Sequence, residues 1–456
     1  MRNQTPIRIL LAVCVLVTLL LAAASAQVSS SSNTKSGDAS SQTSQSQAQM
    51  PTDNQPAADD NAQEPEAPRN FFGEAIGGHF MVDGEASFRQ SYDDNAFASS
   101  LFRFSDNVSM FSGRISWSVQ QRRMVFQAHY APSYRMNARF DNRNAFSQQI
   151  SGAVQYDFSG RSQMDWSVSF ADASTNGAPP FSFATVNGTQ VPVFHPDLIQ
   201  PDVRVQSLRS GVSLTHKFTA RSGVSMGLHG GWSSFSGLNN SALPAGRSRD
   251  NYTAGAVAAW NYEIVAGKKI GVEVGSTYFG FIEPSLHSFY QTAKARYEQK
   301  VIGGLQFSVG AGPSFRVGQS GGDVRTGYVF DVGLSKLTAR GSFGGQYGND
   351  ERLGTTLGGF TSSHAVVYVS RNFHRRWVGG GSFTYSRNRS PNFPDILEGY
   401  AAAAHLGYSL TPSLQLDGGY NYVNQSGRNG PFFGRGFDRN LFSFGVVYNV
   451  GALLRR

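Results

Sequence analysis

The stretch 162-SQMDWSVSFADA-173 places Met164, Trp166, Val168 and Phe170 at alternate positions, with polar residues between them. Successive side chains of a β-strand point to opposite faces of the sheet, so strict alternation predicts a strand with one apolar and one polar face. Such an apolar face either packs on a protein core or faces lipid. The remaining sequence has to distinguish these two environments.

The same period of two recurs in about eighteen segments between residue 69 and the end of the chain. Clear examples lie at residues 150–158, 252–262, 400–410 and 442–450. No long segment has the spacing of an amphipathic helix. The sequence therefore predicts an all-β fold.

The connections between these segments alternate between short and long. Short ones are expected at 121–123, 159–161, 219–221, 266–268, 299–302, 335–337, 374–375 and 411–413. Long ones are expected at 91–106, 138–146, 174–204, 236–250, 348–359, 389–398 and 427–439, and two shorter connections, 283–287 and 318–323, fall between them on the same side. Short turns at one rim and long loops at the other are typical of transmembrane β-barrels. We therefore expect a single antiparallel up-and-down barrel of about 18 strands, with 16 as the alternative. Its short turns would be periplasmic and its long loops extracellular.

The first residues, MRNQTPIRILLAVCVLVTLLLAAASAQ, combine early arginines, a short apolar run and small residues before Gln27. This order predicts a cleaved signal peptide at 1–26 and therefore export. Cleavage would remove Cys14, the single cysteine, so the exported protein could form neither a disulfide nor a thiolate metal site.

Residues 27–68 are mostly Ser, Gln, Ala, Asp and Pro, with almost no large apolar residues. Such a segment cannot bury enough surface to offset the entropy of ordering, so a disordered periplasmic tether is expected. Residues 69–456 contain no second segment of this composition. They are predicted to form the barrel as one unit.

Charge and motifs exclude several classes of function. The chain has 39 Lys and Arg against 31 Asp and Glu, but these charges are scattered singly, so no nucleic acid partner is expected. The histidines are dispersed, and none stands in a nucleophile or metal-binding motif. We expect no enzyme activity, no catalytic residue, no metal and no cofactor.

The last predicted strand reads 443-SFGVVYNV-450, with polar Ser443, then Gly445, then Tyr448 and Val450 at alternate places. It resembles the C-terminal assembly signal of Gram-negative outer-membrane β-barrel proteins, which the barrel-assembly machinery reads. That family usually stops on a terminal Phe, whereas here six residues follow Val450. The resemblance implies an outer-membrane location, with outer-membrane lipids, lipopolysaccharide and the assembly machinery as partners.

A second resemblance concerns the longest connection, 174–204, which follows the fifth predicted strand. In classical diffusion porins the loop at this place folds into the lumen as a constriction. The acidic Pro-Glu-Phe-x-Gly stretch of the porin loop is absent here, so only place and length are similar. An external flap over neighbouring loops is the alternative. A porin-like homo-oligomer is compatible with the resemblance.

A barrel of sixteen or more strands is too wide for side chains to fill, so a water-filled lumen is expected. Its wall would come from the polar positions of the strands. The lumen-facing candidates are Arg114, Arg135, Asp157, Asp165, Arg209, Lys217, Glu263, Glu273, Arg296, Arg316, Asp331, Arg340 and Asp417. Basic residues outnumber acidic ones among them, which predicts a mild anion preference. The same charges could instead only solvate the wall and pair between strands.

The expected function is passive diffusion of small hydrophilic solutes or ions through this charged lumen. The alternative is a non-conducting receptor, adhesin or envelope anchor. Arginines of the long connections, among them Arg389 and Arg439, are candidates for contact with lipopolysaccharide phosphates, because guanidinium groups bind phosphate through paired hydrogen bonds. The alternative is that these charges only keep the loops soluble.

Overall fold

The computed structural model describes residues 79–97, 103–174, 181–186, 189–194, 203–237, 250–282, 287–317, 324–354, 358–374, 376–389, 396–428 and 436–451. The expected signal peptide at 1–26 and tether at 27–68 lie outside these residues. Both assignments therefore remain predictions, as does the start of the barrel at residue 69.

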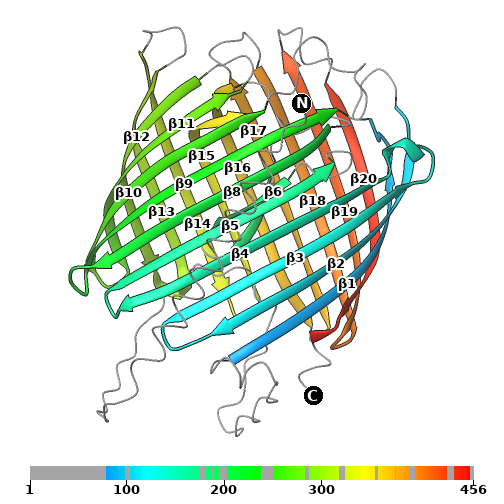
Figure 1. Ribbon diagram of the computed structural model, residues 1–456, viewed down its shortest axis with the longest axis horizontal. Coiled ribbons are helices and arrows are strands. Elements are labelled where there is room, and N and C mark those ends of the chain that lie inside the picture. Colours follow the sequence, from blue (N-terminus) through cyan, green and yellow to red (C-terminus); the bar gives the residue numbers. More distant parts are fainter. Residues whose placement is uncertain are drawn as a thin grey trace, which may run out of the picture. The chain divides into compact units, whose positions relative to one another are not determined.

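Eighteen strands form one sheet (Figure 1). They are β1 (His79–Asp93), β2 (Asp106–Gln120), β3 (Met124–Asn137), β4 (Ala145–Ser159), β5 (Ser162–Ser174), β8 (Val203–Lys217), β9 (Ser222–Gly237), β10 (Asn251–Val265), β11 (Lys268–Phe281), β12 (His287–Val301), β13 (Leu305–Val317), β14 (Val324–Thr338), β15 (Gly341–Gly354), β16 (Gly358–His374), β17 (Trp377–Arg389), β18 (Ile396–Thr411), β19 (Leu414–Arg428) and β20 (Phe437–Asn449). Two short strands, β6 (Phe181–Val186) and β7 (Thr189–Phe194), form a separate hairpin. Within the described residues, two single-turn 3₁₀ helices, η1 (Asp141–Arg143) and η3 (Ile302–Gly304), lie in connections.

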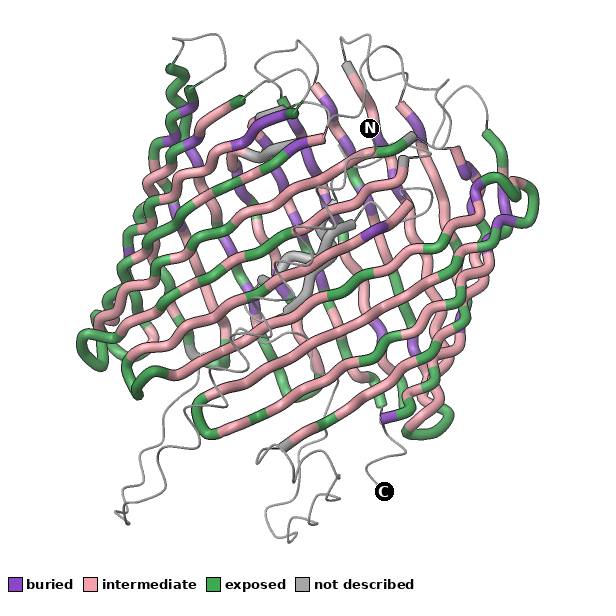
Figure 2. The backbone as a smooth tube through the Cα atoms, in the orientation of Figure 1, coloured by how far each residue is buried: buried purple, intermediate pink, exposed green. Residues whose placement is uncertain are grey.

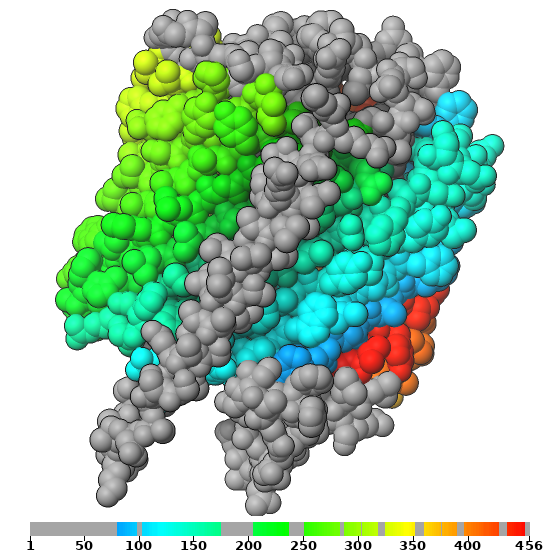
Figure 3. Space-filling view, in the orientation of Figure 1, coloured from blue at the N-terminus to red at the C-terminus, as the bar shows by residue number. Residues whose placement is uncertain are grey.

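The sheet closes on itself. Each strand pairs antiparallel with the next strand of the sheet along the chain, β5 pairs with β8, and β20 pairs with β1 from Glu85 opposite Asn449 to Asp93 opposite Leu441. In Figure 3 the red C-terminal strands accordingly lie beside the blue first strand. The fold is a closed up-and-down β-barrel of 18 strands, which confirms the predicted class and the larger of the two strand counts.

The wall has two faces, because residues opposite each other in neighbouring strands share a face. Trp166 in β5 is opposite Val154 in β4 and Val212 in β8, and following such partners around the ring leads back to the same face of β5. We call this the apolar face, and the face that carries Asp165 the polar face.

Large side chains on the apolar face are open to the surroundings. Leu228 is 62 % exposed, and Val367 and Phe444 are each 58 % exposed. A continuous apolar surface around a closed barrel is the property of a barrel that spans a lipid bilayer. The alternation of Met164, Trp166, Val168 and Phe170 is therefore that of a strand facing lipid.

Most connections lie where the sequence predicted them, with two clear exceptions. The long connection expected at 348–359 is reduced to 355–357, because β15 continues to Gly354 and β16 begins at Gly358. Residues 335–337, expected as a turn, belong to β14, and the turn to β15 is at 339–340, where the Thr338 hydroxyl donates to the Gly341 carbonyl at 2.8 Å. Ser335 lies on the polar face, while Lys336 is on the apolar face near the short-turn rim, where a long side chain can reach the headgroups. Polar residues were thus mistaken for a turn.

Candidate permeation pathway

The structure places the lumen candidates in the wall, with one exception. Register puts Arg114, Arg135, Asp157, Asp165, Arg209, Lys217, Glu263, Glu273, Arg296, Arg316, Asp331 and Asp417 on the polar face. Arg340 lies outside the wall, in the turn between β14 and β15, because β14 continues to Thr338. The set of predicted lumen-facing residues therefore has one basic residue fewer.

Four charged side chains of the polar face form one ion-pair cluster. Lys294 Nζ lies 3.1 Å from Glu273 Oε1 and 3.7 Å from Asp331 Oδ1. Arg296 lies 2.9 Å from Glu273 Oε2 and 4.0 Å from Asp331 Oδ2. Strand β13 separates these bases from Asp331, and a Cβ added to its Gly310 would lie 2.9 Å from Asp331 Oδ1. The missing side chain lets Asp331 reach over β13, so two acids neutralise two bases.

A second ion pair, at the seam where the barrel closes, also spans a strand that carries a glycine between the two charged residues. Arg89 on β1 lies 3.1 Å from Asp417 on β19, and Gly445 of β20 stands between them, opposite both residues. A Cβ on Gly445 would lie 2.8 Å from the Phe88 carbonyl oxygen and 3.4 Å from Arg89 Cβ. Gly445 belongs to the predicted assembly signal, and the structure gives it a packing role. Recognition of Ser443, Gly445, Tyr448 and Val450 by the assembly machinery remains a prediction.

The long connection between β5 and β8 contains the β6–β7 hairpin, and β7 lies against β16 and β17. In the ring of 18 strands, β17 is nine strands from β8 in either direction. The connection therefore leaves one wall and makes contact with the opposite wall.

Part of the polar face of β16–β18 is buried. Val366, Thr384 and Ala401 stand opposite one another on three successive strands, and each is at most 3 % exposed. Tyr368, the next residue on this face of β16, is 6 % exposed. Such burial means that something covers this part of the wall, and β7 is in contact with two of its strands.

A bidentate ion pair, called the clamp below, joins the two strand ends that flank the same connection. Arg204 donates through Nε to Asp172 Oδ1 at 2.6 Å and through a terminal nitrogen to Asp172 Oδ2 at 2.8 Å. Gln206 adds a longer bond of 3.4 Å to the same carboxylate. Asp172 is only 5 % exposed. These residues end β5 and begin β8, so the clamp fixes the two points from which the connection leaves the wall.

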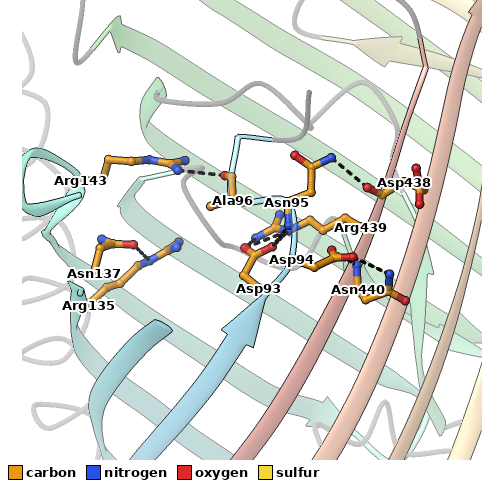
Figure 4. A network of polar contacts seen from close by, with 10 residues as sticks. All are labelled: Asp93, Asp94, Asn95, Ala96, Arg135, Asn137, Arg143, Asp438, Arg439 and Asn440. Atoms are coloured by element: carbon orange, nitrogen blue, oxygen red, sulfur yellow. Dashed lines mark hydrogen bonds and ion pairs between the residues drawn. The ribbon is translucent and has the colours of Figure 1, made fainter. Parts of the chain in front are cut away.

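A polar network joins β1 to β20 at the long-loop rim (Figure 4). Arg439 Nε lies 3.0 Å from both carboxylate oxygens of Asp93, and Asn440 donates to Asp94 through its backbone and its side chain. Arg439, expected to reach lipopolysaccharide, is instead paired with the buried Asp93, because the end of β1 lies beside the start of β20. Arg389 is exposed at the end of β17.

The network extends to the next two connections. Arg143 donates to the Ala96 carbonyl at 2.9 Å, and its guanidinium carbon lies 4.4 Å from the centre of the Phe97 ring. Arg135 donates to the Asn137 side chain at 3.1 Å. Buried positions are frequent toward this rim, as the purple segments in Figure 2 show. Arg135 thus lies in the rim network although it is on the polar face.

Sequence reasoning missed the clamp at Asp172 and Arg204. The available signal was that both residues flank the longest connection. In the described part of the chain, no group of three or more His, Cys, Asp or Glu residues is arranged to hold a metal ion. Among the described residues there is also no helix with the length and hydropathy needed to cross a membrane.

No protein-family model matches the chain, and no curated protein matches it in sequence. Among solved structures it is similar to the outer membrane protein OpdK of Pseudomonas aeruginosa, with 12 % identity, 82 % of this chain and 100 % of that chain covered, and a TM-score of 0.42. It is also similar to OccK2 (OpdF) of the same organism, with 11 % identity, 81 % of this chain and 99 % of that chain covered, and a TM-score of 0.45. A third similar structure is a mutant of the ferric enterobactin receptor PfeA of Pseudomonas aeruginosa, with 8 % identity, 81 % of this chain and 80 % of that chain covered, and a TM-score of 0.43. Likeness at this level assigns neither a family nor a function.

Proposed function

We propose that this protein is an outer-membrane channel through which small hydrophilic solutes or ions diffuse passively, past a constriction made by the 175–202 connection. The observation that carries the proposal is the contact of β7 with β16 and β17, on the far side of a closed barrel of 18 strands.

The size of the barrel supports an open interior. Side chains fill barrels of about eight strands, whereas barrels of sixteen or more leave an aqueous channel unless a separate element plugs them. The apolar face is the face exposed to lipid, so the polar face and its ion pairs would line the lumen. Charged residues that line a lumen hold water and set the preference for ions.

The hairpin supports a narrowed passage over an external flap. A flap would contact neighbouring loops at the rim, whereas β7 contacts strands of the opposite wall. A single hairpin is too small to fill the cross-section of an 18-stranded barrel, so solutes would pass beside it. Without Arg340 the predicted lumen residues comprise six bases and six acids, so the mild anion preference no longer follows from their number. It stays in the proposal as the property that the reversal potential tests.

Single-channel recording of the purified full chain in a planar bilayer tests this proposal. Reproducible conductance steps are expected, with a reversal potential in a salt gradient that indicates anion preference. Replacing 181–194 with a short Gly-Ser link should raise the step size several-fold, because the passage widens. The matched control shortens 238–249, which connects the neighbouring strands β9 and β10, and should leave the step size nearly unchanged.

A folded barrel that never conducts would overturn the channel proposal. Folding is checked independently by the shift in gel mobility on heating that intact barrels show. In that case the receptor, adhesin or anchor becomes the better account.

A further inference from the structure

The polar face carries two exposed bases on the wall opposite the strands that β7 contacts. Arg209 of β8 and His229 of β9 both lie on this face, and both residues are exposed. Strand β8 is nine strands from β17, with which β7 is in contact. A solute that passes beside the hairpin would therefore meet these two side chains.

The two bases are neighbours on the wall. Gly231 stands opposite Arg209 and is two residues from His229 on the same face of β9, while Gly211 stands opposite His229. A Cβ on Gly231 would lie 3.5 Å from Arg209 Cγ, and a Cβ on Gly211 would lie 3.8 Å from His229 Cβ. Each base therefore stands beside the strand of the other, and the positions between them are glycines.

Two hydroxyl groups flank the pair of bases. Thr253 of β10 stands opposite Gly231, and its Oγ1 would lie 3.1 Å from a Cβ there. Ser167 of β5 stands opposite Gly211, is exposed, and has its Oγ 3.9 Å from the corresponding Cβ position. Hydroxyls can donate to anions, as can guanidinium and imidazole groups. Four possible donors from four neighbouring strands thus share one part of the wall.

No acid stands beside these bases on the polar face of β5, β8, β9 or β10. Arg209 forms no ion pair within the described residues. Asp165 of β5 is opposite Ser213, which is four residues, or about 13 Å, along β8 from Arg209. Glu263 of β10 is farther away, near the short-turn rim. A local positive charge therefore remains here, although the predicted lumen residues as a whole are balanced.

From these positions we propose that Ser167, Arg209, His229 and Thr253 form a binding site for a small tetrahedral oxyanion, such as sulfate or phosphate. The guanidinium would donate to two oxygens of the anion, because its planar fork fits paired oxygens. The hydroxyls and the imidazole would donate to the others. We call these four residues the Arg209 site. The site rests on the proposed channel function, since the anion would bind on the channel wall.

The site should respond to pH through His229, because an imidazole changes charge between about pH 5 and 8. The charged residue nearest to it on β8 is Arg209, and β10 presents only Thr253, Gly255 and Val257 at the neighbouring positions of this face. Protonation adds a second positive charge beside the first. An oxyanion should therefore bind more tightly at the acid end of this range.

Calorimetric titration of the purified full chain in detergent with sulfate tests the site at about pH 5 and about pH 8. Sulfate keeps both charges across this range, so a change in affinity belongs to the protein. Binding should be several-fold tighter at the lower pH. Arg209→Gln should weaken it about tenfold at both values, as expected for loss of a charged donor. His229→Gln should keep the affinity of the higher pH and abolish the gain at the lower pH.

Two matched controls separate a site from a general field in the lumen. Lys217→Gln removes an exposed base from the same face of β8, and His405→Gln removes an exposed imidazole from the polar face of β18, nine strands from β9. Both variants should bind sulfate as the unmodified chain does, with the same dependence on pH.

The proposal is overturned if sulfate does not bind to the folded barrel, if Lys217→Gln weakens binding as much as Arg209→Gln, or if His229→Gln keeps the dependence on pH. A barrel that binds sulfate in the expected pattern but never conducts would refute the channel and leave the site standing. A conducting barrel that does not bind sulfate would refute the site alone.

Discussion

The guanidinium of Arg204 donates to both carboxylate oxygens of Asp172, at 2.6 and 2.8 Å, and so ties the end of β5 to the start of β8. The β6–β7 hairpin, which reaches the opposite wall, lies between these two points in the chain. Bidentate pairs of this kind fix orientation as well as distance. The pair is therefore suited to holding the connection in one position.

We predict that Asp172→Asn leaves the barrel folded but loosens the base of this connection. Loss of one partner of a charged hydrogen bond costs about 1–3 kcal/mol. The expected readout is a noisier single-channel current with brief closures. Arg204→Lys should have a similar effect, because lysine keeps the charge but cannot form the fork.

Asp157→Asn serves as the control for the clamp, since Asp157 lies near the short-turn end of β4 and should leave the current quiet. If Asp172→Asn and Asp157→Asn give indistinguishable traces, the clamp does not position the connection. The double variant Asp172→Asn with Arg204→Gln should be no worse than either single variant, because both remove the same interaction.

Gly445 should tolerate no side chain. Its Cβ would lie 2.8 Å from the Phe88 carbonyl oxygen, within the seam between β20 and β1, so Gly445→Ala is expected to destabilise the barrel by about 1–3 kcal/mol. The measurement is urea unfolding in vesicles, followed by gel mobility. Gly160→Ala is the control, since a Cβ there meets nothing within 4 Å. Equal midpoints for the two variants would contradict the packing role of Gly445.

The sequence predicted the barrel because alternation needs only local information. A strand that separates lipid from water must alternate along its whole length, so the faces of β5 could be assigned from twelve letters. The prediction of a turn at 335–337 was wrong because it also used only local information. Ser335 and Lys336 are polar neighbours, and polarity alone does not distinguish a turn from the membrane rim.

The contacts at the candidate site could not be predicted from the alternation of apolar and polar residues. Asp172 and Arg204 meet only because β5 pairs with β8 across the longest connection. Arg439 pairs with the buried Asp93 because the first and last strands are neighbours in the closed barrel. Partners of this kind follow from register and closure. A single sequence gives neither, so it placed Arg439 outside and Arg340 in the wall.

Charges on the two faces of β5 should have unequal effects. Val168 lies on the apolar face opposite Gly152 and Ser210, and Ser167 lies on the polar face opposite Ala153 and Gly211. Val168→Lys should cost about 2–4 kcal/mol near the bilayer midplane, while Ser167→Lys should be tolerated. Insertion into lipid vesicles, read as the folded fraction on a gel, measures both. Equal folded fractions would contradict the assignment of the two faces.

Removing one acid from the ion-pair cluster should shift ion selectivity toward anions. Glu273 and Asp331 together neutralise Lys294 and Arg296, so Glu273→Gln leaves one uncompensated positive charge on the polar face. If this face lines the channel, the field of that charge favours anions and opposes cations.

The reversal potential of single channels in a KCl gradient measures this shift, and it should decrease at high salt because mobile ions screen the charge. Arg296→Gln removes a base from the same cluster and should shift the potential in the opposite direction. Arg340→Gln changes the net charge by the same amount but acts from the turn at 339–340, so it should have a smaller effect. Opposite signs for Glu273→Gln and Arg296→Gln cannot arise from a general loss of stability. If neither changes the potential in a conducting barrel, the cluster lies away from the ion path and serves only to pair the strands β11, β12 and β14.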